Sequence, residues 1–107
     1  MATKTVKVLG LKPGELPELW IIENTLEALQ RCVGGYVEAH QIGDLTLLCN
    51  EDGCQLGLAP NRVIVGNLYR GTVVLIKTGK SGNTVSMTQK AIREGMLIFG
   101  YRYNDKD

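Results

Sequence analysis

Asparagine and arginine side chains at two expected turns are the clearest candidates for chemistry in this 107-residue chain. Asn61 and Arg62 directly follow a proline, and Arg70 directly follows a tyrosine. Arginine offers a planar fork of N–H donors that matches a phosphate, while an asparagine amide both donates and accepts. We therefore expect these three residues to bind a small anionic, nucleotide-like ligand. In the alternative interpretation, Arg62 and Arg70 only bind the carbonyl groups of loops.

Two further segments carry cations that suit such a ligand. Lys80 lies in a Gly-Lys-Ser triplet similar to the end of a phosphate-binding P-loop, but Val74 stands where that motif needs a glycine. The triplet also lies between two strand-like runs rather than before a helix, so a P-loop is excluded and Lys80 remains a candidate anion contact on a hairpin loop. Near the C-terminus, Tyr101 and Arg102 place an aromatic ring beside a cation, an arrangement that suits a base and a phosphate.

The sequence predicts no catalytic centre and no metal site. His40 is the only histidine, and no serine or cysteine stands in a recognisable nucleophile turn. Cys49 and Cys54 have nearly the spacing of a zinc knuckle, but no second pair follows, and a closed structural zinc site needs four ligands. Three cysteines are also a poor disulfide framework in so short a chain. We expect free thiols, no cofactor and no enzymatic activity.

Charge is distributed unequally along the chain. Residues 1–54 contain four basic and eight acidic side chains, whereas residues 55–107 contain eight basic and three acidic ones. Such asymmetry favours an anionic partner, unless the two halves interleave in space and give a mixed surface. An aromatic content of 6% and a pI near 7.7 argue against generic nucleic-acid binding.

Hydrophobic periodicity predicts a single α+β domain over residues 1–107, with a frayed tail at 104–107. The expected architecture is a curved, mainly antiparallel sheet with one principal helix. Period-2 or β-branched segments bounded by turn residues predict strands at 5–11, 19–22, 36–42, 45–50, 54–58, 63–65, 71–77, 84–87 and 96–103. The last of these segments contains the apolar run 96–99, which fits either the core or an oligomer contact.

Two helices are expected from their capping residues. The principal helix spans residues 25–33, with Asn24 as its N-cap and a glycine pair after it as the stop signal. A short second helix spans residues 89–94, with Thr88 as its N-cap and Gly95 as its end. No apolar run approaches the roughly 20 residues of a membrane helix, and the first residues are polar, so we expect a cytoplasmic protein without membrane contact.

Three segments in order resemble one known family. Residues 24–38 read NTLEALQRCVGGYVE, residues 47–53 read LLCNEDG, and residues 58–62 read LAPNR. Together they are similar to the family catalogued as domain of unknown function 3846, over about residues 6–87. Its members are small proteins common in phages, prophages and mobile elements. The family implies no particular functional residue.

This resemblance implies a phage-type role in the cytoplasm of a host cell. Small non-enzymatic phage proteins often counter host defence, either by blocking a host protein or by sequestering a nucleotide messenger. The basic second half favours sequestration of a small phosphate-bearing signalling ligand, in a homo-oligomer whose sites form between subunits. The alternatives are an inhibitor or adaptor that acts on a host protein, and a nucleotide-modifying enzyme.

Overall fold

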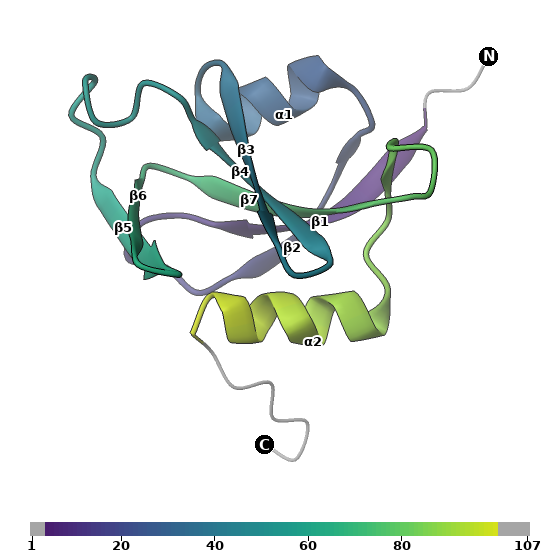
Figure 1. Cartoon of the computed structure of the whole chain (residues 1–107). Helices are drawn as coiled ribbons and strands as arrows, with labels where there is room; N and C mark the ends of the chain where they lie inside the picture. Colours follow the sequence, from purple (N-terminus) through teal and green to yellow (C-terminus); the bar gives the residue numbers. More distant parts are fainter. Residues whose placement is uncertain (1–3, 101–107) are drawn as a thin grey trace.

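The computed structural model describes residues 4–100 and has an α+β architecture (Figure 1). Its main sheet has the antiparallel order β2-β1-β7-β4-β3, and β8 pairs with the free end of β7. A two-stranded sheet, β5-β6, lies beside it. The strands are β1 (Thr5–Leu11), β2 (Glu18–Glu23), β3 (Val37–Ile42), β4 (Leu45–Asn50), β5 (Pro60–Ile64), β6 (Asn67–Arg70), β7 (Val73–Thr78) and β8 (Thr84–Val85).

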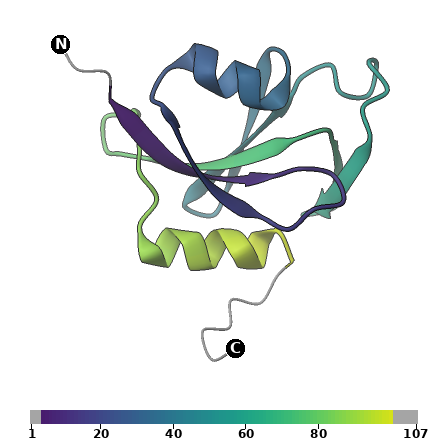
Figure 2. The ribbon, with the colours of Figure 1, turned by 180° about the vertical axis from the view of Figure 1, so that it is seen from behind.

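The sheet is covered on both faces. Helix α1 (Leu26–Val33) lies on one face and helix α2 (Gln89–Ile98) on the other, as Figures 1 and 2 show from opposite sides. Strand β7 is buried from Val73 to Ile76, because alternate side chains of a strand point to opposite faces and both faces here are covered. One core therefore lies between the sheet and α1, and a second lies between the sheet, α2 and the β5-β6 hairpin.

Helix α1 confirms the expected principal helix, with a different cap. The hydroxyl of Thr25, not the side chain of Asn24, accepts the N–H of Ala28 at 3.1 Å. Asn24 instead donates from Nδ2 to the carbonyl of Thr84, which ties the start of the helix to β8. Gly34 ends the helix in the left-handed conformation, at φ 79°, as the glycine pair predicts.

Helix α2 is longer than expected, and the strand expected from residue 96 is wrong. Thr88 caps the helix as expected, but Gly95 lies inside it rather than at its end. A Cβ at Gly95 would lie 2.8 Å from Cδ2 of Leu9, so this glycine allows the helix to approach the sheet closely. Phe99 is fully buried and Leu97 is 63% exposed, so the apolar run mainly supplies the core. No helix within residues 4–100 is long and apolar enough to cross a membrane.

Two expectations at and before the β5-β6 hairpin are wrong. Residues 54–57 form turns and residue 58 has no regular structure, so the strand expected over 54–58 is absent; Pro60 begins β5 instead of interrupting the pattern. A proline fits there because β5 pairs with β6 alone and has no partner in the main sheet. Val65 and Gly66 form the connecting turn with φ 49° and 80°, and positive φ is rare for a β-branched residue.

Candidate functional site

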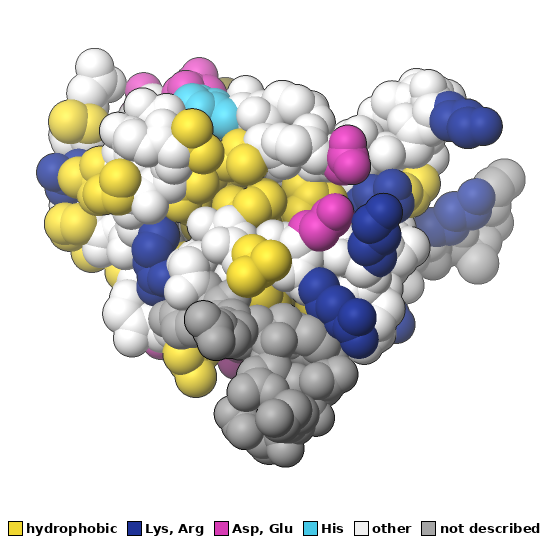
Figure 3. All heavy atoms as spheres, turned by 60° about the horizontal axis from the view of Figure 1, so that its bottom comes forward, with side chains coloured by type: hydrophobic (Ala, Val, Ile, Leu, Met, Phe, Trp, Pro, Cys, Tyr) yellow, Lys and Arg dark blue, Asp and Glu magenta, His cyan; other side chains and the backbone are white. Residues whose placement is uncertain are grey.

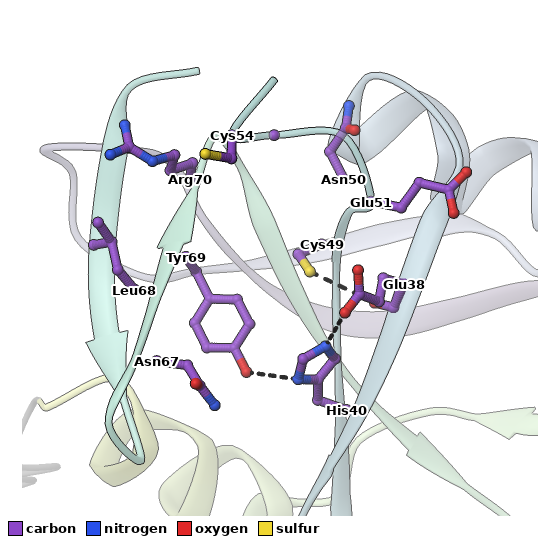
Figure 4. A pocket seen from close by; sticks show the side chains of 11 residues that line it. Glu38, His40, Cys49, Asn50, Glu51, Cys54, Asn67, Leu68, Tyr69 and Arg70 are labelled. Atoms are coloured by element: carbon purple, nitrogen blue, oxygen red, sulfur yellow. Dashed lines mark hydrogen bonds and ion pairs between the residues drawn. The ribbon is translucent and has the colours of Figure 1, made fainter. Parts of the chain in front are cut away.

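A pocket of about 420 Å³ lies between the β3-β4 hairpin, the turns that follow β4, and strand β6 (Figure 4). Its lining is polar on several sides, since acidic, amide, imidazole and thiol side chains all contribute. The lining side chains used below are those of Glu38, His40, Cys49, Glu51, Tyr69 and Arg70. A volume of this size suits a small organic ligand.

Glu38, His40 and Tyr69 form a hydrogen-bonded chain along one wall of the pocket (Figure 4). Nε2 of His40 lies 2.6 Å from Oε2 of Glu38, and Nδ1 of His40 lies 3.0 Å from the hydroxyl of Tyr69. With Nε2–H donating to the carboxylate, the hydroxyl of Tyr69 donates to Nδ1. The two rings meet edge to face at 5.5 Å between centroids, which fixes the imidazole plane.

Strand geometry explains how these side chains meet. Glu38 and His40 are two residues apart on β3, so they share one face of the sheet. Cys49 lies directly opposite Glu38 in the β3-β4 register, and its thiol is 3.7 Å from the Glu38 carbonyl. Tyr69 reaches the group from β6, where its side chain is 5% exposed.

Burial keeps the thiol of Cys49 and the hydroxyl of Tyr69 protonated. Burial raises the pKa of the Cys49 thiol from 9.0 to about 11, and the charge of Glu38 adds to this rise. Burial also raises the pKa of Tyr69 above 10.0, and Cys49 contributes further, although a hydrogen bond with Asn67 opposes the rise. Both groups are therefore neutral at pH 7 and present a polar but uncharged floor beside the Glu38 carboxylate.

Asn50 shapes the turn that closes one end of the pocket. It is 7% exposed, and its Nδ2 donates to the carbonyl of Val33 at 3.2 Å. Its Oδ1 accepts the backbone N–H of Asp52 at 2.8 Å, in the manner of an Asx turn. Gly35 lies against this amide, since a Cβ there would be 2.8 Å from Nδ2. The end of α1 and the turn after β4 are thereby held together.

Arg70 is one of the residues expected from sequence to bind a ligand, and it lines this pocket. Its NH1 donates to the carbonyl of Leu58 at 3.2 Å, and Figure 4 shows its guanidinium turned away from His40, at the opposite rim. A guanidinium has five N–H donors, and the bond to Leu58 uses one of them. Arg70 therefore makes the bond to a loop carbonyl that the alternative interpretation expects, and it also lies at the rim of a pocket.

The other expected residues lie elsewhere. Nδ2 of Asn61 donates to the carbonyls of Leu11 at 2.9 Å and Gly71 at 2.7 Å, and NH1 of Arg62 donates to the carbonyl of Phe99. Both side chains join β5 to neighbouring elements and neither lines the pocket. Lys80 is exposed in the β7-β8 turn, apart from the pocket. Tyr101 and Arg102 lie outside the described residues.

The two oppositely charged halves of the chain interleave. Strand β7 of the second half lies between β1 and β4 of the first half. Lys77 and Lys90 line a second hollow, of about 250 Å³, together with Asp44 and Glu94. Figure 3 shows basic and acidic side chains next to one another on the face that α2 covers. This part of the surface is therefore of mixed charge.

Sequence reasoning missed the Glu38–His40–Cys49–Tyr69 group. A signal for part of it was present, because the hairpin expected over 36–42 and 45–50 turns at residues 43–44. That register places Glu38 opposite Cys49, with His40 on the same face. Tyr69 gave no such signal, because β6 was not expected and its contact with His40 spans 29 residues.

Comparison with known proteins supplies a family but no characterised relative. No curated protein and no solved structure matches the chain. A family match covers residues 6–99, which includes both sheets and both helices. On that match, this chain belongs to the family described as a domain of unknown function, DUF3846.

Proposed function

We propose that this chain is a non-enzymatic binding protein that sequesters a small phosphate-bearing, nucleotide-like molecule in the pocket between the β3-β4 hairpin and β6. The observation that carries the proposal is a pocket of about 420 Å³ that has Arg70 at one rim and the carboxylates of Glu38 and Glu51 on the opposite side (Figure 4). Its polar groups come from β3, β4, the turns after β4, and β6. Such convergence is typical of small-ligand sites.

Charge determines the orientation of the ligand in this pocket. A phosphate is repelled by Glu38 and Glu51 and attracted by Arg70, so the phosphate belongs at the Arg70 rim. The carboxylates on the other side are hydrogen-bond acceptors and suit the hydroxyl groups of a ribose or the exocyclic amine of a base. The ligand then spans the pocket, with its anionic end at β6 and its neutral donors near β3.

Sequestration follows from binding without chemistry. A protein in excess over a signalling nucleotide lowers the free concentration by mass action, and this suits the phage-type, counter-defence role that the family resemblance implies. A second copy of the chain would complete the open side of the pocket if the active form is a homo-oligomer. Native mass spectrometry gives the subunit count and the ligand count in one measurement.

The test compares Arg70→Gln with Arg31→Gln against a panel of cyclic and linear nucleotides and ADP-ribose. Arg31 is the matched control, because it is exposed on α1 and pairs with Glu23 at 3.5 Å, away from the pocket. We expect one ligand of the panel to bind and to be recovered unchanged. Arg70→Gln should weaken it at least tenfold, while Arg31→Gln leaves the affinity unchanged.

Three results would contradict this assignment. Equal loss in both variants would indicate a general charge effect rather than a contact at Arg70. Normal binding by Arg70→Gln would place the ligand elsewhere. Conversion of the ligand to a product would support the nucleotide-modifying alternative.

A protein partner is the second candidate, and the β5-β6 hairpin favours it. Val63 and Leu68 are paired across this hairpin and are 64% and 49% exposed, and Val65 at its tip is 79% exposed. Figure 3 shows hydrophobic side chains gathered at the side where this hairpin lies. Solvent-exposed apolar side chains grouped in this way suit a protein contact. Co-purification of a host protein that Val63→Lys abolishes, with no nucleotide bound, would favour this function.

A further inference from the structure

Three side chains that line the pocket have the chemistry of a transition-metal site. The thiol of Cys49, the imidazole of His40 and the carboxylate of Glu38 place one ligand atom each within 4.8 Å of one another. In a tetrahedral zinc site the metal–ligand distances are about 2.0–2.3 Å, which sets neighbouring ligand atoms about 3.3–3.8 Å apart. The group is thus already nearly as compact as such a site requires.

We propose that Cys49 Sγ, His40 Nε2 and a carboxylate oxygen of Glu38 bind one Zn²⁺ ion. Only a small adjustment is required, since Nε2 of His40 and Oε2 of Glu38 lie 2.6 Å apart and must separate by less than about 1 Å to admit the ion between them. Glu38 is half-exposed at its side chain and can move toward solvent. Cys49 loses its thiol proton to solvent as the Zn–S bond forms.

Tyr69 positions the imidazole in the state that the metal needs. A histidine that binds metal through Nε2 keeps its proton on Nδ1 and donates it to a neighbouring acceptor. The hydroxyl of Tyr69 lies 3.0 Å from Nδ1 and is that acceptor. In the metal-free chain the same bond runs in the opposite direction, because Nε2–H then faces Glu38. Tyr69 is therefore a positioning residue and not a ligand.

The donor set selects the type of ion. Thiolate and imidazole favour zinc and related transition metals, whereas magnesium and calcium take oxygen ligands. Three protein ligands leave a fourth position for water or a ligand, and His40 and Glu38 both line the pocket, so this position opens into it. A divalent ion there would offset the charge of Glu38. The metal site stands independently of the proposed nucleotide ligand, since the ion alone is its probe.

The experiment titrates the full, tag-free chain with Co²⁺, a spectroscopic substitute for zinc, in the presence of a non-thiol reductant and without nucleotide. We expect one ion per chain, a tetrahedral visible spectrum and a thiolate-to-cobalt charge-transfer band, all displaced by one equivalent of Zn²⁺. Cys49→Ser should remove the charge-transfer band. Cys54→Ser is the matched control, because Cys54 lines the same pocket, is exposed, and belongs to no ligand group within residues 4–100.

His40→Gln and Glu38→Gln keep the test decisive if Cys49→Ser fails to fold. Both side chains are partly exposed, at 32% and 50%, so their replacement should leave the fold intact. Each should weaken Zn²⁺ binding at least tenfold by calorimetry. Tyr69→Phe should weaken Zn²⁺ binding about 10–100-fold while keeping the charge-transfer band, as expected when the hydrogen-bond partner of a metal-binding histidine is lost.

Three outcomes would overturn the proposal. One is an octahedral cobalt spectrum without a thiolate band, which would indicate loose binding to surface groups. The other is a band that Cys54→Ser removes and Cys49→Ser retains. Normal zinc affinity in both His40→Gln and Glu38→Gln would refute the site in the same way.

Discussion

Replacing Asn61 by alanine separates a structural role of this residue from a ligand-binding one. Nδ2 of Asn61 donates to the carbonyls of Leu11 and Gly71, which joins β5 to the end of β1 and to the start of β7. Each such bond contributes about 1 kcal/mol net. Alanine also leaves those two carbonyls without their donor. Oδ1 of Asn61 is buried, and no donor in the described part of the chain reaches it, so its removal offsets part of that further cost.

We expect Asn61→Ala to lower the free energy of unfolding by about 2 kcal/mol, or roughly 10 °C in Tm for a domain of this size. Asn61→Asp should cost more, because it sets a carboxylate against two carbonyl oxygens. Urea denaturation followed by circular dichroism measures both variants. Asn83→Ala is the control, since Asn83 is exposed in the β7-β8 loop and its side chain accepts a hydrogen bond from the exposed hydroxyl of Ser81, so its loss should change stability by less than about 0.5 kcal/mol. An Asn61→Ala midpoint equal to that of the control would refute the structural role.

Two further predictions concern the hairpin tip and the pocket thiol. Val65→Asn should stabilise the chain by about 1 kcal/mol, because asparagine accepts the positive φ of 49° that strains a valine. Val65→Thr should not stabilise it, because threonine is also β-branched. Equal melting temperatures for these two variants would contradict this account. The pKa of Cys49 rises from 9.0 to about 11 on folding, so its contribution to stability is complete below pH 9 and is lost as pH rises from 9 to 11. In the metal-free parent chain, the free energy of unfolding measured by urea denaturation should fall by at most about 3 kcal/mol over that range. A similar fall in Cys49→Ala would exclude this thiol as the cause.

The elements predicted best from sequence are those with strong local signals. The expected bounds of β1 and β4 agree with the structure, because both strands combine apolar residues with flanking turn residues. Helix α2 is longer than its sequence predicts, because Gly95 is a local stop signal but lies in the helix where it packs closely against Leu9. Strand β6 was missed because a Val-Gly turn lacks the asparagine that usually marks a tight hairpin.

The candidate site depended even more on tertiary structure. The residue type and turn-like position of Arg70 predict a ligand contact, and the structure places this residue in the lining of the pocket. Asn61 and Arg62 have equally suitable side chains, but the elements packed around them offer backbone carbonyls instead of an open surface. No local pattern distinguishes these two situations, because both place an arginine or asparagine beside a turn.

Because β7 lies between β1 and β4, the main sheet can be completed only late in synthesis. The hairpins β1-β2 and β3-β4 are each local, but they touch in the sheet only through β7, which is the last long strand to leave the ribosome. Until residue 78 is available, both hairpins expose the edges that β7 later joins, and such edges are prone to pair with other chains. A fragment that ends before β7 would therefore contain all the residues that line the pocket and still lack the strand that joins the two hairpins into one sheet.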